Sequence, residues 1–488
     1  MAPTVVRPAA QSSARLGPYL DLRPLMLAAA TGLAALSLAL QWYRFASFRS
    51  LTMDLAVFDQ ALWKLAHGQA PEVTVIGWNV FADHLSPVLL LFVPLYRLAA
   101  TPLWLFLAQA IAFGVGLLSV PALLRVTNVD PRLRPGFLVA YAATPLVWNA
   151  LLVDFHPTTL AVPFLVVGLT AALRRDLRML ALMSVALVLL RDDLGLAVAA
   201  MALAGWTTVW STRERRQRVA LALGGLAWVF VGGAVGSALG ASRHWLPRYG
   251  YLASSPGEAA FHPWRTLPRL VLGLGRVDNL TLAIVCLATV AFLPALSPRR
   301  LLLAGAVALP FLVADDPNLH ALSFHYEAPV FPFLLLAAAT GIHRLSAERA
   351  RVAGRVLIPA FTLIVLVALG PLDTKSLTDR TVGAADARRA LSTIDATDRV
   401  VAGDQLAPHL SQRPFLLPYP YPFAHAGQSF PVSASVARVS PAIAATIDAV
   451  VIGSRSTPDL AGFTPHRYGS VVVYRRENQN LSPASRVH

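Results

Sequence analysis

The chain has 488 residues and carries 41 Lys plus Arg against 26 Asp plus Glu, so its formal net charge is +15. Hydrophobic residues make up 56% and charged residues only 14%, well below the roughly 25% of an average soluble domain. This composition excludes a disordered chain, a coiled coil and a typical cytosolic enzyme. The single cysteine, Cys286, excludes a disulfide scaffold. The positive charge falls in short clusters between long apolar segments, so we predict a polytopic membrane protein without a nucleic-acid partner.

The apolar segments are the candidate membrane spans. A bilayer core about 30 Å thick needs roughly 20 apolar residues per helix, and fewer where neighbouring helices bury the ends. Eleven segments qualify, near residues 22–42, 103–124, 136–153, 158–173, 177–190, 194–211, 219–240, 279–296, 301–314, 328–343 and 353–371. The apolar run 85–99 is short and contains two prolines, so we expect a re-entrant or interfacial segment rather than a twelfth span.

The arginine clusters predict the orientation, because cytoplasmic loops carry an excess of positive charge. The clusters are Arg125/Arg132/Arg134, Arg174/Arg175/Arg178, Arg213/Arg215/Arg216/Arg218, Arg299/Arg300 and Arg344/Arg349/Arg351/Arg355. With eleven spans and a cytoplasmic tail at 1–21, all five clusters lie on the cytoplasmic side of the membrane. We then predict a transmembrane domain at 22–371, whose first external loop is 43–102. Residues 372–488 lie on the external side of the plasma membrane in this prediction.

The C-terminal segment 372–488 has a different composition from the rest of the chain. It is polar and mixed in charge, with strand-like apolar runs at 399–402, 448–453 and 470–474. A helical segment at 384–394 alternates with these runs. We predict a small α/β extracytoplasmic domain with a disordered end.

Ionisable residues at membrane depth are costly, so their positions indicate function. Five groups lie at the external ends of the predicted spans: Asp54 and Asp59; Asp83-His84; Asp154 and His156; Arg191-Asp192-Asp193; and His325-Tyr326-Glu327. An acid beside an imidazole can move a proton, bind a phosphate or hold a metal ion. The chain has no Walker loop, G-x-S-x-G, H-E-x-x-H or C-x-x-C motif, which argues against an ATPase, a serine hydrolase of that type and a zincin.

Each group also has a structural interpretation. Asp54 can cap the helix that follows it, Asp83-His84 can form a polar turn, Asp154 or Thr158 can cap a helix, Arg191 can form an internal ion pair, and Tyr326 can be an interfacial anchor. The spacing alone leaves these alternatives open.

Several motifs resemble a bacterial family of multi-spanning membrane proteins that is classed as a domain of unknown function. They are Asp54-Leu55-Ala56-Val57-Phe58-Asp59-Gln60-Ala61-Leu62-Trp63, Ala66-His67-Gly68, Phe81-Ala82-Asp83-His84-Leu85-Ser86-Pro87, Asp154-Phe155-His156-Pro157, His325-Tyr326 and Leu406-Ala407-Pro408-His409-Leu410-Ser411-Gln412-Arg413. The family usually has Lys-Glu-Asp where this chain has Arg191-Asp192-Asp193. Arginine keeps the positive charge but spreads it over a planar guanidinium, so it does not act as a point charge as lysine does.

That family in turn is similar to the GT-C glycosyltransferases, which use a polyprenyl-phosphate sugar as donor. The order of Asp54, Gly68, His84-Leu85-Ser86-Pro87, Asp154 and His325-Tyr326 matches the order of their motifs, although the usual basic residue and double proline are replaced. The resemblance implies a GT-C-like fold, membrane-lipid contacts, and transfer of a sugar to an envelope glycan or lipid acceptor by direct displacement with inversion.

The resemblance also implies roles for the polar groups. Asp54 would be the base, and His325, Tyr326 and Arg191 would bind the lipid phosphate. Asp83, His84, Asp154 and His156 would shape the sugar or acceptor site or hold a divalent metal ion. Two alternatives remain: a carrier or flippase for a lipid-linked sugar, and a non-catalytic envelope-assembly protein.

Overall fold

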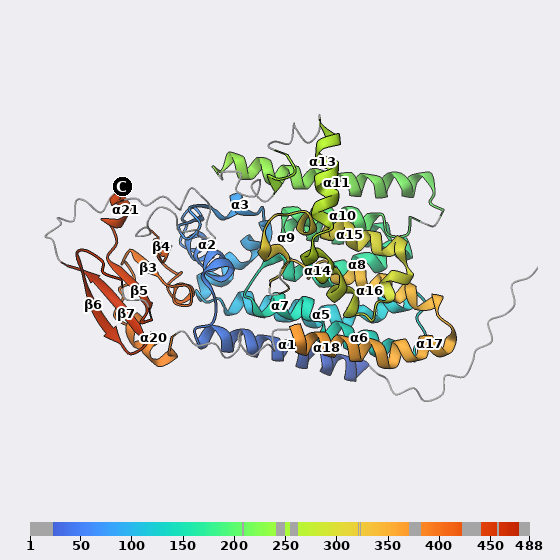
Figure 1. The fold of residues 1–488 in the computed structure, drawn as a ribbon, viewed down its shortest axis with the longest axis horizontal. Helices are drawn as coiled ribbons and strands as arrows, with labels where there is room; N and C mark the ends of the chain where they lie inside the picture. Colours follow the sequence, from blue (N-terminus) through green and yellow to red (C-terminus); the bar gives the residue numbers. More distant parts are fainter. Residues whose placement is uncertain are drawn as a thin grey trace, which may run out of the picture.

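A computed structural model describes residues 23–206, 209–240, 249–253, 262–320, 322, 324–369, 382–421, 441–455 and 458–477. The predicted cytoplasmic tail 1–21 and the predicted disordered end after residue 477 lie outside the described residues. The molecule is elongated, with most helices at one end and a β-sheet module at the other (Figure 1).

The first half of the described chain is mainly helical. Its helices are α1 (Arg23–Ala46), η1 (Thr52–Ala56), α2 (Val57–Ala66), α3 (Val80–Asp83), η2 (Pro87–Phe92), α4 (Val93–Leu98), α5 (Leu103–Val126), α6 (Arg134–Ala143), α7 (Pro145–Leu152), η3 (Pro157–Leu160), α8 (Ala161–Arg174), α9 (Leu177–Leu190), η4 (Asp192–Leu194), α10 (Gly195–Ala202) and α11 (Thr212–Ala238). A two-stranded antiparallel ribbon of β1 (Glu72–Val73) and β2 (Trp78–Asn79) interrupts them in the first loop.

The second half adds helices and then the sheet module. The helices are α13 (Pro263–Leu274), α14 (Val277–Ala288), η6 (Leu293–Leu296), α15 (Pro298–Leu312), η7 (Pro317–His320), α16 (Phe331–Gly341), η8 (Ile342–Arg344), α17 (Ala347–Val352), η9 (Ala353–Leu357) and α18 (Ile358–Leu369). The module contains α20 (Ala384–Leu391), β3 (Val400–Ala402), η10 (Ala407–His409), β4 (Leu416–Pro418), α21 (Pro441–Ala444), β5 (Ala449–Gly453), β6 (Phe463–Tyr468) and β7 (Val471–Arg476).

The described residues contain six helices that are long and apolar enough to cross a membrane, some of them made of consecutive helical segments. They are Arg23–Ala46, Leu103–Val126, Arg134–Leu152, Pro157–Arg174, Thr212–Ala238 and Ala347–Ala368. The pair α13 and α14, bent by 56°, could add a seventh span. The protein is therefore a helical multi-pass membrane protein. The segment 85–99 folds as the short helix Pro87–Leu98 and is not among these spans.

The remaining segments of the eleven-span prediction form shorter helices. Helix α9 has 14 residues, α10 has 8, α15 has 15 and α16 has 11. At about 1.5 Å per residue, none of these helices alone covers a hydrocarbon core of about 30 Å. Ten of the eleven residues of α16 are buried by other helices, so its apolar sequence reflects burial within the protein.

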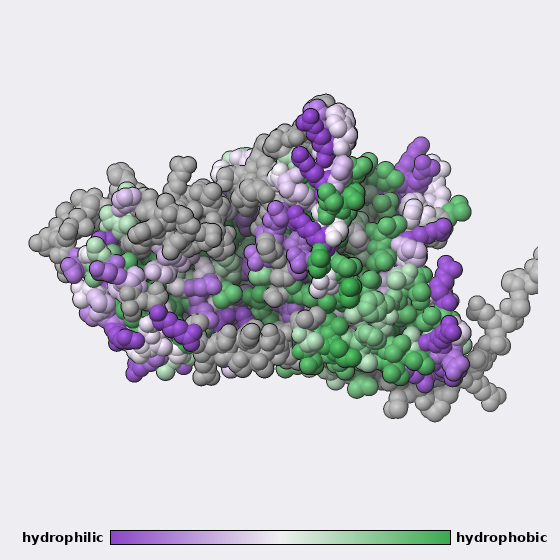
Figure 2. Space-filling view, in the orientation of Figure 1, coloured by the Kyte–Doolittle hydropathy of each residue, from purple (hydrophilic) through white to green (hydrophobic). Residues whose placement is uncertain are grey.

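The outer helices expose apolar side chains. Figure 2 shows a hydrophobic surface over the helical part and hydrophilic residues at the end near α17. The exposed side chains include Leu27 and Leu36 on α1, Leu223 and Phe230 on α11, and Ile364 on α18. Such a surface is stable in contact with lipid chains and would aggregate in water.

The arginine clusters pair with one another across helices. Arg175 forms an ion pair with Glu214, and the Arg355 Nε donates to the Arg132 carbonyl at 3.3 Å. Contacts therefore join the second cluster to the third and the first to the fifth. Each of these two pairs of clusters therefore lies on one side of the membrane. The cytoplasmic location of all five clusters stays a prediction.

The C-terminal module is a five-stranded mixed sheet with the order β4-β3-β5-β7-β6. Strand β3 is parallel to both β4 and β5, while β7 is antiparallel to β5 and β6. The strands predicted from 399–402, 448–453 and 470–474 are confirmed as β3, β5 and β7. All three residues of β3 are buried, as expected for a central parallel strand covered on both faces.

Arg218 gives a test of the packing of α11. Its fully buried guanidinium donates to Glu214 and to the carbonyls of Ala172, Ala202 and Ala204, which end α8 and α10. We expect Arg218→Met to lower the free energy of unfolding by about 3–5 kcal/mol, because it breaks a buried ion pair and strips those carbonyls of a donor. Thermal unfolding in detergent measures the loss. Arg216→Met, an exposed position on the same helix, is the control and should have little effect.

Candidate functional site

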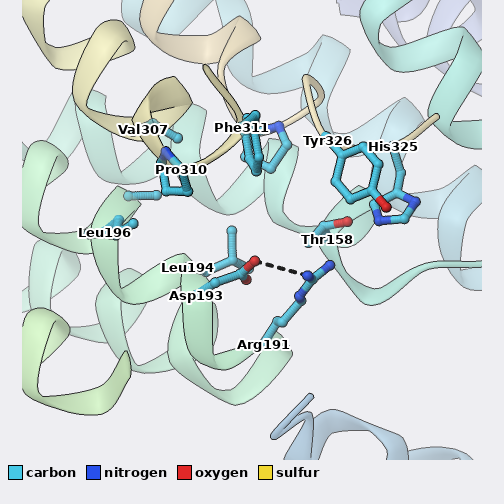
Figure 3. Close-up of a pocket in the computed structure, with 12 residues that line it drawn as sticks. Thr158, Arg191, Asp193, Leu194, Leu196, Val307, Pro310, Phe311, His325 and Tyr326 are labelled. Atoms are coloured by element: carbon cyan, nitrogen blue, oxygen red, sulfur yellow. Dashed lines mark ion pairs between the residues drawn. The ribbon is translucent and has the colours of Figure 1, made fainter. Parts of the chain in front are cut away.

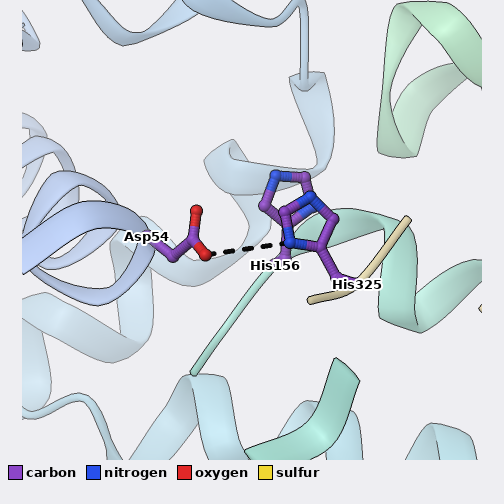
Figure 4. A group of neighbouring side chains, drawn as sticks. All are labelled: Asp54, His156 and His325. Carbon is purple, nitrogen blue, oxygen red and sulfur yellow. Dashed lines mark ion pairs between the residues drawn. The ribbon is translucent and has the colours of Figure 1, made fainter. Parts of the chain in front are cut away.

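Three side chains from distant parts of the sequence meet at the end of the helical part that faces the sheet module. Asp54 lies in η1, His156 precedes η3, and His325 lies in the segment before α16. The His325 Nδ1 is 3.7 Å from the Asp54 Oδ2, and the rings of His156 and His325 stack with centroids 3.5 Å apart (Figure 4). Asp54 is partly exposed, whereas both imidazoles are buried.

Asp54 occupies a strained backbone conformation. Its φ of 69° and ψ of −83° interrupt the helical turn Thr52–Ala56, and a positive φ is unfavourable for a residue other than glycine. Two carboxylates hold the chain just before it: the Leu51 N–H donates to the Asp154 Oδ2 at 2.8 Å, and the Thr52 N–H donates to the Asp404 Oδ1 at 2.8 Å. The strained turn presents the Asp54 carboxyl to the site.

Asp54 is poised to exchange a proton near neutral pH. Burial raises its pKa to about 7, and the negative charge of nearby Asp154 adds to this rise. Burial and the neighbouring His325 lower the pKa of His156 well below its ordinary value. The stacked pair therefore contains a neutral His156, which avoids repulsion between two imidazolium ions.

Arg191 connects His156 to the acidic group Asp192-Asp193. The Arg191 Nη1 donates to the His156 Nε2 at 3.1 Å, and the Arg191 Nη2 lies 3.0 Å from the Asp193 Oδ2. The His84 Nδ1 lies 3.6 Å from the Asp192 Oδ1, and its ring centroid is 6.2 Å from that of His156. The predicted internal pairing of one aspartate with Arg191 falls on Asp193.

The structure thus brings together Asp54, His84, His156, Arg191, His325 and Tyr326. Tyr326 packs against His325 with ring centroids 4.3 Å apart. Asp83 adjoins His84, with 4.0 Å between the Oδ2 and the Nε2. Asp154 is turned to Leu51, so its contacts are those of a residue that positions Asp54.

A mainly apolar groove starts at these residues. Its polar end contains Thr158, Arg191, Asp193, His325 and Tyr326, and its walls come from α10 and α15 (Figure 3). The apolar lining residues are Leu194, Leu196, Ala197, Val307, Pro310, Phe311 and Pro329. The volume of this groove is about 30 Å³, which is enough for a few water molecules.

The donor atoms of Asp54, His156 and His325 lie within 4.8 Å of one another, which raises the question of a metal ion. Two imidazoles and a carboxylate are common ligands of transition metals. However, the His156 Nε2 accepts from Arg191 and its Nδ1 contacts the Thr158 Oγ1 at 2.7 Å, so both ring nitrogens are engaged. This arrangement does not fit a metal bound by all three residues.

The C-terminal module completes the site through the segment 404–413, which sequence reasoning did not connect to Asp54. Besides the Asp404 contact, Ser411 Oγ and Gln412 Nε2 donate to the buried Asp59 at 2.5 and 3.2 Å. The His409 ring stacks on Phe45 and Phe48, with centroids 4.1 and 3.9 Å apart. The motif 406–413 was the available signal, but its residues do not indicate which loop the motif contacts.

Comparison with known proteins identifies the family. Residues 44–433 match the family model described as "Predicted membrane protein (DUF2079)". The chain belongs to the DUF2079 family. The matched residues include the whole site and the segment 404–413. No curated protein matches the chain.

Among solved structures, this DUF2079 protein is similar to the arabinofuranosyltransferase AftD from Mycobacteria. The match has 17% sequence identity and a TM-score of 0.45, and it covers 94% of this chain. The chain spans 42% of the length of that structure, which is therefore much larger.

The strained turn gives a test by substitution. We expect Asp54→Gly to be more stable than Asp54→Ala by about 1 kcal/mol, because glycine adopts a positive φ without a Cβ penalty. Thermal unfolding of the two purified variants measures the difference. Equal stability would show that Asp54 is not held at a positive φ.

Proposed function

We propose that the protein is an inverting GT-C-type glycosyltransferase of the bacterial plasma membrane, which moves a sugar from a polyprenyl-phosphate donor to an envelope glycan or lipid. The supporting observation is the position of the partly exposed Asp54 carboxyl beside His325, which lines the polar end of an apolar groove. One ligand that suits such a groove has a phosphate next to a long apolar chain. In this proposal the site and the C-terminal module lie outside the membrane, with eleven segments of the chain crossing or entering it.

The proposed reaction is a direct displacement. The Asp54 carboxylate takes the proton of an acceptor hydroxyl, whose oxygen attacks the anomeric carbon. The bond between that carbon and the phosphate oxygen breaks, and its electron pair leaves with the lipid phosphate. Arg191, His325 and Tyr326 bind this phosphate and stabilise its growing charge.

The other polar residues have supporting roles. His156 is neutral and accepts a hydrogen bond from Arg191, so it orients the guanidinium towards the phosphate. Asp83 and His84 line the sugar side of the site. Asp154 holds the backbone before Asp54 through Leu51.

The role of Asp54 is tested by transfer in lipid nanodiscs, with radiolabelled polyprenyl-phosphate sugars and an envelope extract as acceptor. We expect Asp54→Asn to lower the rate of transfer by about 10²–10⁴-fold, because the amide cannot take a proton. Donor binding should persist. Full transfer by this variant would remove Asp54 as the base.

The pH dependence follows from the same residue. A base must be ionised, and the Asp54 pKa is about 7, so the wild-type rate should rise with pH and reach half of its maximum near pH 7. A rate that is flat between pH 5 and 9 would contradict this assignment. The measurement is single-turnover transfer at donor concentrations below KM, where the pH profile reports the free enzyme.

A double substitution distinguishes two roles of Arg191, which are binding of the donor phosphate and neutralisation of Asp193. Arg191→Gln alone leaves the Asp193 carboxylate without its ion pair, so it combines loss of stability with loss of phosphate binding. The double variant Arg191→Gln/Asp193→Asn removes both charges. If Arg191 binds the donor phosphate, both variants should raise the donor KM by about ten- to a hundredfold. Recovery of a normal KM in the double variant would show that Arg191 only neutralises Asp193.

A further inference from the structure

A second cavity lies where the C-terminal module meets the first loop. It has a volume of about 240 Å³ and is lined by Leu51, Val382, Gly403, Asp404, Gln405, Leu406 and Gly453. Its walls therefore combine the chain just before Asp54 with the module's sheet. Pockets for drug-sized ligands have volumes of roughly 300–1,000 Å³, so this cavity suits a smaller group on the scale of one sugar ring.

The topology of the sheet explains why a cavity forms there. Gly403 directly follows β3 and Gly453 ends β5, and these two strands are parallel neighbours. From β3 the chain continues to β4 on one side, and from β5 it continues to β6 at the opposite edge of the sheet. The two connections diverge and open a crevice at the carboxyl ends of the strands, which is the general position of ligand sites in open α/β sheets.

The lining defines the chemistry of an occupant. Asp404 is the only ionisable side chain among the seven lining residues, so the cavity repels phosphates and carboxylates. Gln405 adds an amide, while Leu51, Val382 and Leu406 add apolar surface. A carboxylate, an amide and aliphatic groups together match a neutral ring that carries hydroxyl groups on its edges and C–H groups on its faces.

Asp404 also links the cavity to the proposed base. One carboxylate oxygen accepts from the Thr52 N–H, and the Asp404 carbonyl accepts from the Thr52 Oγ1 at 3.0 Å. A carboxylate can accept about four hydrogen bonds, so Asp404 keeps capacity for a ligand hydroxyl. Thr52 lies two residues before Asp54, so a ligand on Asp404 is connected to the turn that presents the base.

We propose that this cavity, formed by the ends of β3 and β5 against Leu51, binds a neutral saccharide unit of the acceptor. The identification of that saccharide as the acceptor rests on the proposed function, whereas the binding itself does not. In this proposal the cavity holds the sugar residue adjacent to the one that reacts. Asp404 connects the two sugar positions, because it lines the cavity and also contacts Thr52 in the turn that carries Asp54. Donor recognition stays with the groove between α10 and α15.

Saccharide binding is tested on the full chain in nanodiscs by saturation-transfer NMR. The probes are the methyl glycosides of glucose, galactose, mannose and N-acetylglucosamine, with inorganic phosphate for comparison. We expect at least one glycoside to bind and phosphate to fail. Gln405→Trp should fill the cavity and weaken glycoside binding by about tenfold or more, the equivalent of the hydrogen bonds that it removes.

The control is His466→Trp, which places the same side chain on an exposed position of β6 at the far edge of the sheet. It should bind the glycoside as the wild type does. If Gln405→Trp fails to fold, as judged by thermal unfolding, Gln405→Leu removes the amide with little change in size and should also weaken binding. The proposal is overturned if no glycoside binds, if phosphate binds instead, or if the Gln405 and His466 variants behave alike.

The Asp54→Asn variant separates this proposal from the proposed function. It should bind the glycoside with unchanged affinity, because Asp54 does not line the cavity. Glycoside binding without any transfer by the wild type would retain the saccharide site and remove the transferase. Transfer by the wild type without glycoside binding would retain the transferase and remove the saccharide site.

Discussion

Two hydrogen bonds to consecutive backbone amides hold the site together. Asp154 binds the Leu51 N–H, and Asp404 binds the Thr52 N–H. A positive φ at a residue such as Asp54 costs about 1–3 kcal/mol and persists only when its surroundings enforce it. Hydrogen bonds to carboxyl groups from two directions, one from the helical part and one from the sheet module, offset that cost. The position of Asp54 therefore depends on the packing of both parts.

Burial has opposite effects on the pKa values of the carboxyl and imidazole groups of the site. Desolvation raises the pKa of Asp54 and lowers that of His156, so the first can take up a proton while the second stays neutral. The neutral His156 lies near Asp54 and accepts a hydrogen bond from the Arg191 guanidinium, whose charge is balanced by Asp193. An acidic side and a cationic side of one small site are what a proton acceptor and an anionic leaving group require.

The C-terminal module has a direct structural role at this site. Its segment 404–413 reaches the first loop through Asp404 and packs His409 between Phe45 and Phe48. Ser411 and Gln412 bind the buried Asp59 in the helix that follows Asp54. Loosening the module would release the turn at Asp54, and the cavity at the ends of β3 and β5 lies at this junction. In the proposed function, substrate recognition and positioning of the base share this one set of contacts.

The sequence determined the membrane class, the approximate positions of the long helices, three of the five strands of the module and the polar groups of the site, through its apolar content and motif order. Hydropathy could not separate a lipid-facing span such as α1 from a short helix such as α16, because both are apolar and only one is covered by protein. Nor could spacing show that Asp154 bonds to Leu51 or that Asp404 bonds to Thr52, a pair 352 residues apart. Such contacts depend on how helices and sheet pack in three dimensions, and local periodicity carries no record of that packing.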